Sequence, residues 1–178
     1  MHLRVAALDD IGVLRRIAGL YESRRYQVLS LSTGPTEEPG IVGINLKLDE
    51  TPERAERLCR QLRRLFDVLE VTAYYEDDLV CRELALIQII PGPEVTREQI
   101  LEITAEFDGR PVGSDPESLV VEATGEPGQL DLLVAKLSEL GALTVSRTGS
   151  VAVPKNAGNS PGKPKEENHG NYFLRSTC

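Results

Sequence analysis

The segment Asp9-Asp10-Ile11-Gly12-Val13-Leu14 has residue types that could recognise a small ligand. It runs from the end of an expected strand into the start of an expected helix. Gly12 permits a tight turn and close approach by a ligand. The free amides at a helix start, together with the helix dipole, favour a carboxylate. Asp9 or loop carbonyls could receive an ammonium group. The apolar side chains that could line a slot are Val13, Leu14, Val28 and Leu29.

A free α-amino acid presents the matching set of groups: a carboxylate, an ammonium group and a side chain. The same residues also fit a structural role, in which Asp10 caps the helix and Gly12 eases a bend. The local residues leave both interpretations open, so effector binding is a hypothesis at this point.

The other charged groupings do not suggest a catalytic centre. The acidic pairs Asp9-Asp10, Glu37-Glu38 and Asp77-Asp78 all fall in expected connections, where we interpret them as solvated turn charges. The arginine pairs lie at helix surfaces or ends and are interpreted as solvated or partner-facing. The sequence contains no dinucleotide-binding, P-loop or zinc-protease motif.

Cysteine and histidine usage excludes further classes. Cys59, Cys81 and Cys178 are far apart and odd in number, which argues against a disulfide framework or a cysteine-rich zinc site. Cys59 lies on an apolar helical stripe and is expected in the core. His2 and His169 lie near the extremities, where an ordered general base is not expected. We therefore expect no catalytic residue and no metal ligand in this chain.

Overall composition limits the partners. The chain has 178 residues, a net charge of -8 and no tryptophan, so nucleic acid is not an expected partner. It has no apolar run long enough to span a membrane and no secretion signal. The sequence therefore predicts a cytoplasmic protein that interacts with neither nucleic acid nor membranes.

The strands and helices expected to position these residues occur in the same order in both halves of the chain. Strands are expected at 2–8, 26–33, 41–48 and 67–75, with helices at 12–24 and from Thr51-Pro52 onward. The second half predicts strands at 82–90, 110–114, 118–124 and 142–148. Its helices are expected at 96–107, with Thr96 and Gln99 as a capping box, and from Glu126 to a C-terminal cap at Gly141.

Two βαββαβ units predict an α+β protein of two tandem ferredoxin-like domains. We expect domains at 1–76 and 82–153, joined by a linker at 77–81. Residues 154–178 are rich in proline, glycine, asparagine and lysine and are expected to form a flexible tail.

Ordered sequence blocks over about residues 2–155 resemble the small regulatory subunit of acetolactate synthase, also called acetohydroxyacid synthase. The first block is Gly12-x-Leu14-x-Arg16-Ile17-x-x-Leu20, and the next is Arg24-x-Tyr26-x-Val28-x-Ser30-Leu31, followed by Pro35-Thr36 and Pro39. After Asp67-Val68 come Arg82-Glu83-Leu84-x-Leu86-Ile87 and Arg147-Thr148-Gly149-x-Val151-Ala152. Each block is weak alone, but their order and spacing are specific.

The resemblance implies an N-terminal ACT domain, a second domain of similar topology and a homodimer formed through the ACT domains. It implies a non-catalytic chain that binds and stimulates a catalytic large subunit and confers feedback inhibition by a branched-chain amino acid, chiefly valine. Thiamine diphosphate, Mg²⁺ and FAD are then expected only in the large subunit. The implied effector-binding residues are Asp9, Asp10, Ile11, Gly12, Val13, Leu14, Gln27 and Val28.

Departures from the family pattern leave an alternative open. Family members usually carry asparagine where this chain has Asp9 and Gln27. A carboxylate at position 9 could repel the effector's carboxylate or recruit its ammonium group, and Gln27 is one methylene longer than asparagine. The alternative is a stand-alone ACT-type amino-acid-binding or protein-interaction module with an altered or lost valine response. A small enzyme on the same scaffold is a third hypothesis, for which the polar residues offer little support.

Overall fold

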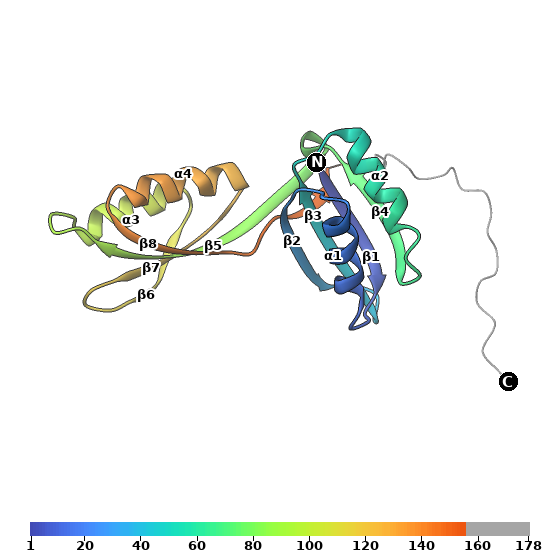
Figure 1. Ribbon diagram of the computed structural model, residues 1–178. Coiled ribbons are helices and arrows are strands. Elements are labelled where there is room, and N and C mark those ends of the chain that lie inside the picture. The colour runs from blue at the N-terminus through green and yellow to red at the C-terminus, as the bar shows by residue number, and fades with distance from the viewer. Residues whose placement is uncertain (156–178) are drawn as a thin grey trace.

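The first unit of the chain is a four-stranded antiparallel sheet with two helices on one face (Figure 1). The computed structural model describes residues 1–155. The strands run in the order β2-β3-β1-β4. The elements are β1 (His2–Leu8), α1 (Val13–Ser23), β2 (Val28–Pro35), β3 (Ile41–Leu48), α2 (Pro52–Leu62) and β4 (Val68–Tyr74).

The second unit repeats this arrangement. Its main strands run in the order β6-β7-β5-β8, which is the same topology as in the first unit. The prediction of two tandem ferredoxin-like α+β domains is confirmed. After a short 3-10 turn, η1 (Glu76–Asp78), the elements are β5 (Leu79–Pro91), α3 (Arg97–Glu106), β6 (Arg110–Ser114), β7 (Leu119–Gly125), α4 (Pro127–Ser138) and β8 (Gly141–Arg147).

Local signals explain where two of the helices begin. The Thr51 side chain accepts a hydrogen bond from the Arg54 N–H at 3.4 Å, and Pro52 occupies the first helical position of α2. At the start of α3 the side chain of Thr96 and that of Gln99 each accept from the other's backbone N–H, at 3.3 and 2.9 Å. The predicted cap of α2 and capping box of α3 are confirmed.

Each unit has its own apolar core between its sheet and its helices. In the first unit, Leu3, Val5 and Ile44 from the sheet pack with Ile17 of α1 and Leu58 of α2. Cys59 belongs to this core, as predicted, and burial raises the pKa of its thiol above the usual range. The second core combines Ile87, Ile89 and Val121 of the sheet with residues of α3 and α4 such as Ile100 and Leu133. Because each unit has a separate core, each is a distinct packing unit of the chain.

A single long strand joins the two units. β5 has 13 residues, and its first part, Leu79–Arg82, pairs with an additional strand, β9 (Val151–Pro154). From Ala85 onward it pairs with β8 instead, so the chain passes twice between the units (Figure 1). Residues 77–81, expected as a linker, comprise the end of η1 and the start of β5. The tail expected from Pro154 onward lies outside the described residues, apart from Pro154 and Lys155.

The predicted helix cap at Gly141 is wrong. Helix α4 ends at Ser138, and Gly141 is the first residue of β8. A side chain at Gly141 would collide with the backbone carbonyl of Ile90 in the neighbouring strand. Glycine is therefore present because two backbones approach closely at this point, and not because a left-handed residue ends the helix.

Candidate functional site

The loop between β1 and α1 is held by its own backbone and by the side chain of Asp10. The Asp9 N–H donates to the Gly40 carbonyl at 2.8 Å, and the Val13 N–H donates to the Asp10 carbonyl at 3.0 Å. Helix α1 begins after Gly12, which has no side chain to cap it. The Asp10 carboxylate instead accepts from the Gly12 N–H at 3.3 Å. Asp10 therefore has a structural role, but it holds the turn before α1 and does not cap the helix with its side chain as predicted.

Arg16 ties this loop to the core of the first unit. Its guanidinium donates to the Asp10 carboxylate at 2.5 Å and, through Nε, to the Asp67 carboxylate at 2.8 Å. It also lies over the Phe66 ring, 4.8 Å from the ring centroid. The hydrogen bond from Arg16 lowers the pKa of the Asp10 carboxyl, and the two carboxylates raise the pKa of Arg16. Asp10 and Arg16 therefore both remain charged at neutral pH, and the loop is anchored electrostatically.

Asp67 is the buried end of this network. The residue is 0% exposed, and its Oδ1 atom has no hydrogen-bond partner in the described structure. A buried carboxylate with one unsatisfied oxygen depends strongly on the partner it has. The position of Arg16 is therefore important for both the stability of the unit and the shape of the loop.

Two apolar side chains of the loop face outward. Ile11 is fully exposed and Leu14 is 38% exposed, whereas Val13 is buried in the core. Burial of the exposed aliphatic carbon against a ligand or partner would be favourable. The loop thus presents an apolar surface beside a helix start and two carboxylates, Asp9 and Asp10, which are the groups expected for recognition of an aliphatic amino acid.

The structure does not bring Gln27 and Val28 to this loop within one chain. Val28 pairs with Leu48, close to the pairing of His2 with Lys47, whereas Leu8 pairs with Ile41 at the other end of the sheet. The predicted effector-binding residues therefore form two groups, at opposite ends of the first unit. The Gln27 N–H donates to the Glu50 carboxylate at 2.9 Å, and the Gln27 carbonyl accepts from the Asp49 N–H at 3.0 Å.

Residues at the junction of the two units were missed at the level of sequence. Ser150 donates its N–H to the Ser30 hydroxyl at 3.4 Å and accepts from the Ser32 hydroxyl at 3.2 Å. Gly149, with φ of 75°, lies against Ser30. On the other side, the Thr148 hydroxyl accepts from the Leu84 N–H at 3.1 Å. These contacts link β2 of the first unit to β5 of the second, and serines 118 to 120 residues apart in sequence carry no local signal of such pairing.

His2 also has a different place from the one expected. It is only 3% exposed, and its Nε2 atom lies 3.5 Å from the Glu76 carboxylate and 3.9 Å from the Cys81 sulfur. Burial, with a contribution from Lys47, lowers the pKa of His2 below its usual value. The histidine near the start of the chain is thus part of the junction between β1, η1 and β5.

Within residues 1–155, no cluster of three or more histidine, cysteine or carboxylate side chains is placed to hold a metal ion. Among the same residues, no helix is both long and apolar enough to cross a membrane.

Comparison with known proteins first defines the class. A family model described as an ACT domain matches residues 9–71, which contain the loop, both helices and most of the sheet of the first unit. A second family model, described as the small subunit of acetolactate synthase, matches residues 82–156. The first unit is therefore an ACT domain, and the second unit points to one particular family.

Related proteins that align with most of this chain point to the same family. The acetolactate synthase small subunit of Bacillus subtilis is 37% identical over 151 residues, covering 84% of this chain and 87% of the relative. The corresponding subunit of Aquifex aeolicus is 33% identical over 151 residues, covering 85% and 79%. That of Mycolicibacterium smegmatis is 33% identical over 153 residues, covering 86% and 89%. The chain belongs to the family of acetolactate synthase small subunits, as the sequence blocks predicted.

A solved structure shares the fold. The acetolactate synthase small subunit of Thermotoga maritima superimposes with a TM-score of 0.79 at 23% sequence identity, covering 86% of this chain and 96% of that one. The agreement extends over both units and supports the two-unit architecture.

Proposed function

We propose that this chain is a non-catalytic regulatory subunit of acetolactate synthase. In this proposal it binds and stimulates the thiamine-diphosphate-dependent large subunit and confers feedback control by a branched-chain amino acid, chiefly valine. The chain itself carries no cofactor, and thiamine diphosphate, Mg²⁺ and FAD belong to the large subunit. One observation carries the feedback part: helix α1 begins at a glycine without a side-chain cap, beside exposed Ile11 and Leu14.

The groups of the loop suggest how the effector is recognised. Its carboxylate would take the place of the Asp10 carboxylate at the Gly12 N–H, where the helix dipole favours an anion. Its ammonium group would be received by Asp9 or by the displaced Asp10. Its short aliphatic side chain would cover Ile11 and Leu14, which are otherwise in contact with water.

A homodimer would bring together the two groups of predicted residues. β2 lies at one edge of the first sheet and runs parallel in direction to β1, so its Val28 end lies far from the loop of its own chain. Antiparallel pairing of two β2 edges about a twofold axis places Val28 of one copy beside the loop of the other. Leu29 on this edge strand is 60% exposed, which supports an apolar contact there. The effector would then bind between two copies.

The serine contacts at the junction supply a route for the regulatory signal. An effector that favours one arrangement of the β2 edges acts on a strand whose Ser30 and Ser32 are hydrogen-bonded to Ser150. A shift of β2 would therefore be felt by the second unit. Regulation follows only if the effector binds the two arrangements with different affinity.

A specific contact favours a second candidate function, a regulatory subunit that has an altered or lost valine response but is not a stand-alone module. The Asp10 carboxylate already fills the helix start and is held there by Arg16 at 2.5 Å. An effector must displace it. If this displacement costs more than the effector gains, the chain stimulates the large subunit without responding to valine.

Reconstitution with the cognate large subunit tests the proposal, because activity and feedback are separate readouts. We expect the small subunit to raise the rate of the large subunit and valine to lower it, and calorimetry with the small subunit alone to give heat at millimolar valine, leucine or isoleucine. A rate unchanged by the small subunit contradicts the regulatory role. Stimulation without heat or inhibition establishes the second candidate.

A matched pair of variants locates the effector. Ile11→Asp places a charge on a fully exposed loop residue, whereas Leu132→Asp does the same at a 61% exposed residue of α4 in the second unit. Because neither side chain is in a core, both variants should fold. We expect Ile11→Asp to abolish valine binding and Leu132→Asp to leave it unchanged. Equal effects of the two would contradict a site at the first loop.

A further inference from the structure

The helical layer of the first unit carries a concentration of exposed arginines. Residues 13–25 and 52–64 contain nine arginines, no lysine and three glutamates, although the chain as a whole has a net charge of -8. α1 and α2 lie side by side on the same face of the first sheet (Figure 1). We call the exposed members of this set whose side chains make no hydrogen bond the arginine layer. It consists of Arg15, Arg24, Arg25, Arg57, Arg60 and Arg64. Arg63 is exposed as well, but its guanidinium donates to the Val71 carbonyl at 2.7 Å and it is not a member.

The fold does not use these side chains internally. Arg15, Arg24, Arg25, Arg57 and Arg64 make no side-chain hydrogen bond or ion pair with any described residue, and Arg60 only reaches Glu56 at 3.8 Å. The buried faces of the helices are apolar, with residues such as Ile17 and Leu58 in the core. The arginine layer is therefore available to a partner and contributes self-repulsion to the isolated chain.

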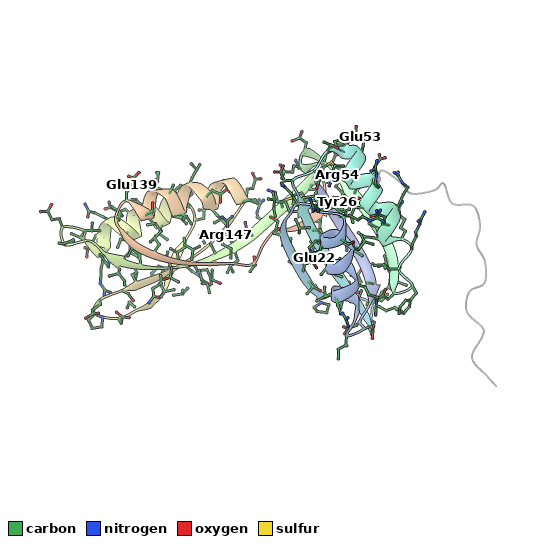
Figure 2. All side chains as sticks on the ribbon, viewed as in Figure 1. Glu22, Tyr26, Glu53, Arg54, Glu139 and Arg147 are labelled. Carbon is green, nitrogen blue, oxygen red and sulfur yellow. The ribbon has the colours of Figure 1, made fainter. Side chains whose placement is uncertain are left out.

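Two other arginines of α1 and α2 differ from the arginine layer because their side chains form ion pairs within the fold. Arg54 donates to the Glu50 carboxylate at 2.5 Å and lies over the Tyr26 ring at 5.0 Å, and Figure 2 shows Arg54 close to Tyr26 at the end of the first unit. Arg16 is bound to Asp10 and Asp67. Both are partly buried, whereas the members of the arginine layer are exposed.

The choice of arginine over lysine indicates the chemistry of the partner. Lysine serves equally well for solubility, but arginine is less strongly hydrated and its planar guanidinium binds a carboxylate through two parallel hydrogen bonds. Protein interfaces are accordingly enriched in arginine and depleted in lysine. On α2 and the turn after it, Arg57, Arg60 and Arg64 recur at spacings of three and four residues, so they share one outward face.

We infer that the arginine layer is the surface through which this chain docks on the large subunit of acetolactate synthase, against a carboxylate-rich patch of that partner. The inference rests on the proposed function. A protein partner fits better than a nucleic acid because Glu22, Glu53 and Glu56 lie among the arginines and would repel a phosphate backbone.

The location of the layer connects docking with regulation. Arg15 follows Leu14 directly in the first turn of α1, so the helix whose start is proposed to hold the effector also presents the docking surface. A change at the loop would reach the large subunit through one rigid element. Arginine pairs at such an interface would also increase the association rate at low salt.

Charge reversal on α2 tests the inference. We expect the double variant Arg57→Glu, Arg64→Glu to bind the large subunit at least tenfold more weakly than the wild type at 50 mM salt. The wild-type chain should lose affinity when salt is raised from 50 to 300 mM, and the double variant should lose less. The matched control is Arg4→Glu, because Arg4 is exposed, makes no ion pair with a described residue and lies on the opposite face of the same sheet. The control should bind within twofold of the wild type.

Further readouts separate the possible failures. Thermal melting and valine calorimetry should match the wild type, which shows that the double variant folds. A wild-type chain that does not bind the large subunit contradicts the proposed function itself. If the wild type binds and the double variant binds equally well, or if Arg4→Glu weakens binding to the same extent, the arginine layer is not the docking surface. Binding of a short duplex RNA, with no binding of the large subunit, would also overturn the inference.

Discussion

The two units share one topology but differ at the start of their first helix. In the second unit, Thr96 and Gln99 satisfy the helix start of α3 from within the helix itself. In the first unit, the corresponding position is Gly12, and the amide of the helix start is bonded only by Asp10 from the preceding loop. A side chain that lies outside the helix can be displaced by a ligand, whereas a capping box cannot without loss of the helix start. The comparison suggests why one copy of the fold would bind an effector and the other would not.

The helical layers of the two units also differ in charge. The helices of the first unit and the turns after them are rich in arginine, whereas residues 97–108 and 126–139 of the second unit contain seven acidic residues, one arginine and one lysine. The same scaffold thus presents two chemically opposite surfaces. Docking on one partner through one unit therefore requires no change of fold, only a different choice of exposed side chains.

The largest expected effect concerns the arginine that bridges two carboxylates in each unit. Arg16 joins Asp67 and Asp10, and Arg147 joins Glu83 and Asp131. Arg16→Ala leaves Asp67 buried without a partner and should lower the free energy of unfolding by about 3 kcal/mol. Arg147→Ala should cost about half as much, because the side chain of Glu83 is 8% exposed and that of Asp67 is 0% exposed.

Denaturant unfolding, with hydrogen exchange to assign the effect to each unit, measures this difference. The double variant Arg16→Met, Asp67→Leu serves as the control, since it removes both members of the buried pair and should be less destabilised than Arg16→Ala. A larger loss from Arg147→Ala than from Arg16→Ala would contradict the assignment of the more deeply buried charge to the first unit.

Two glycines distinguish close packing in the second unit from open space in the first. Gly141→Ala should destabilise the protein by about 2 kcal/mol, because its new methyl group meets the Ile90 carbonyl. Gly19→Ala should instead stabilise it by about 0.5 to 1 kcal/mol, because Gly19 lies on the exposed face of α1 with nothing within 4 Å of an added Cβ atom. Thermal melting would detect both. Stabilisation by Gly141→Ala would contradict the close approach of the two backbones at this position.

Removal of the hydrogen bonds that Ser30 and Ser32 make with Ser150 should have a small effect on stability and a large effect on regulation. Removing the Ser30 and Ser32 hydroxyls should cost about 1 kcal/mol per hydrogen bond, because the contacts with Ser150 are neutral. In the reconstituted enzyme, Ser30→Ala, Ser32→Ala should bind valine normally and yet show weakened inhibition. Ser146→Ala, an exposed residue of β8, is the control. Inhibition that remains normal in the double variant would exclude this route between the units.

The smallest effect is a pH dependence at the junction of the units. The pKa of His2 is lowered by burial, so the unfolded chain binds this proton at a higher pH than the folded chain. The folded state is therefore fully stable above the usual histidine pKa of about 6.5 and loses stability as the pH falls from there toward the lowered pKa. His2→Gln should flatten the melting temperature between pH 7.5 and 5.5. An unchanged slope would mean that His2 is accessible to protons in the folded state.

Much of the fold could be predicted because its signals are local. The alternation of strand and helix patterns, the Thr51-Pro52 start of α2 and the capping box of α3 each depend on residues within one turn of each other. β9 was missed because it has only four residues and its pairing partner, the start of β5, is about 70 residues away. Gly141 was misjudged because the backbone that it approaches belongs to another strand.

The candidate site could be predicted only in part. The residue types of the Asp9–Leu14 loop suggested both a cap and a ligand site. In the structure the Asp10 carboxylate accepts from the Gly12 N–H in the turn before α1, and the helix itself has no side-chain cap. The anchor of the loop is Asp67, which lies 51 residues from Arg16 in sequence and has no local signature. The distance between the loop and Val28 was also not evident, since it follows from the strand order of the sheet.

Hydrogen exchange on the full chain with and without valine locates the effector site, because it compares the two units in one experiment. We expect valine to slow exchange in residues 9–14 and at the start of β2, and to leave exchange in the corresponding loop of the second unit, residues 92–96, unchanged. Protection of residues 92–96 instead, or equal protection of the two loops, would contradict the assignment of the effector site to the first unit.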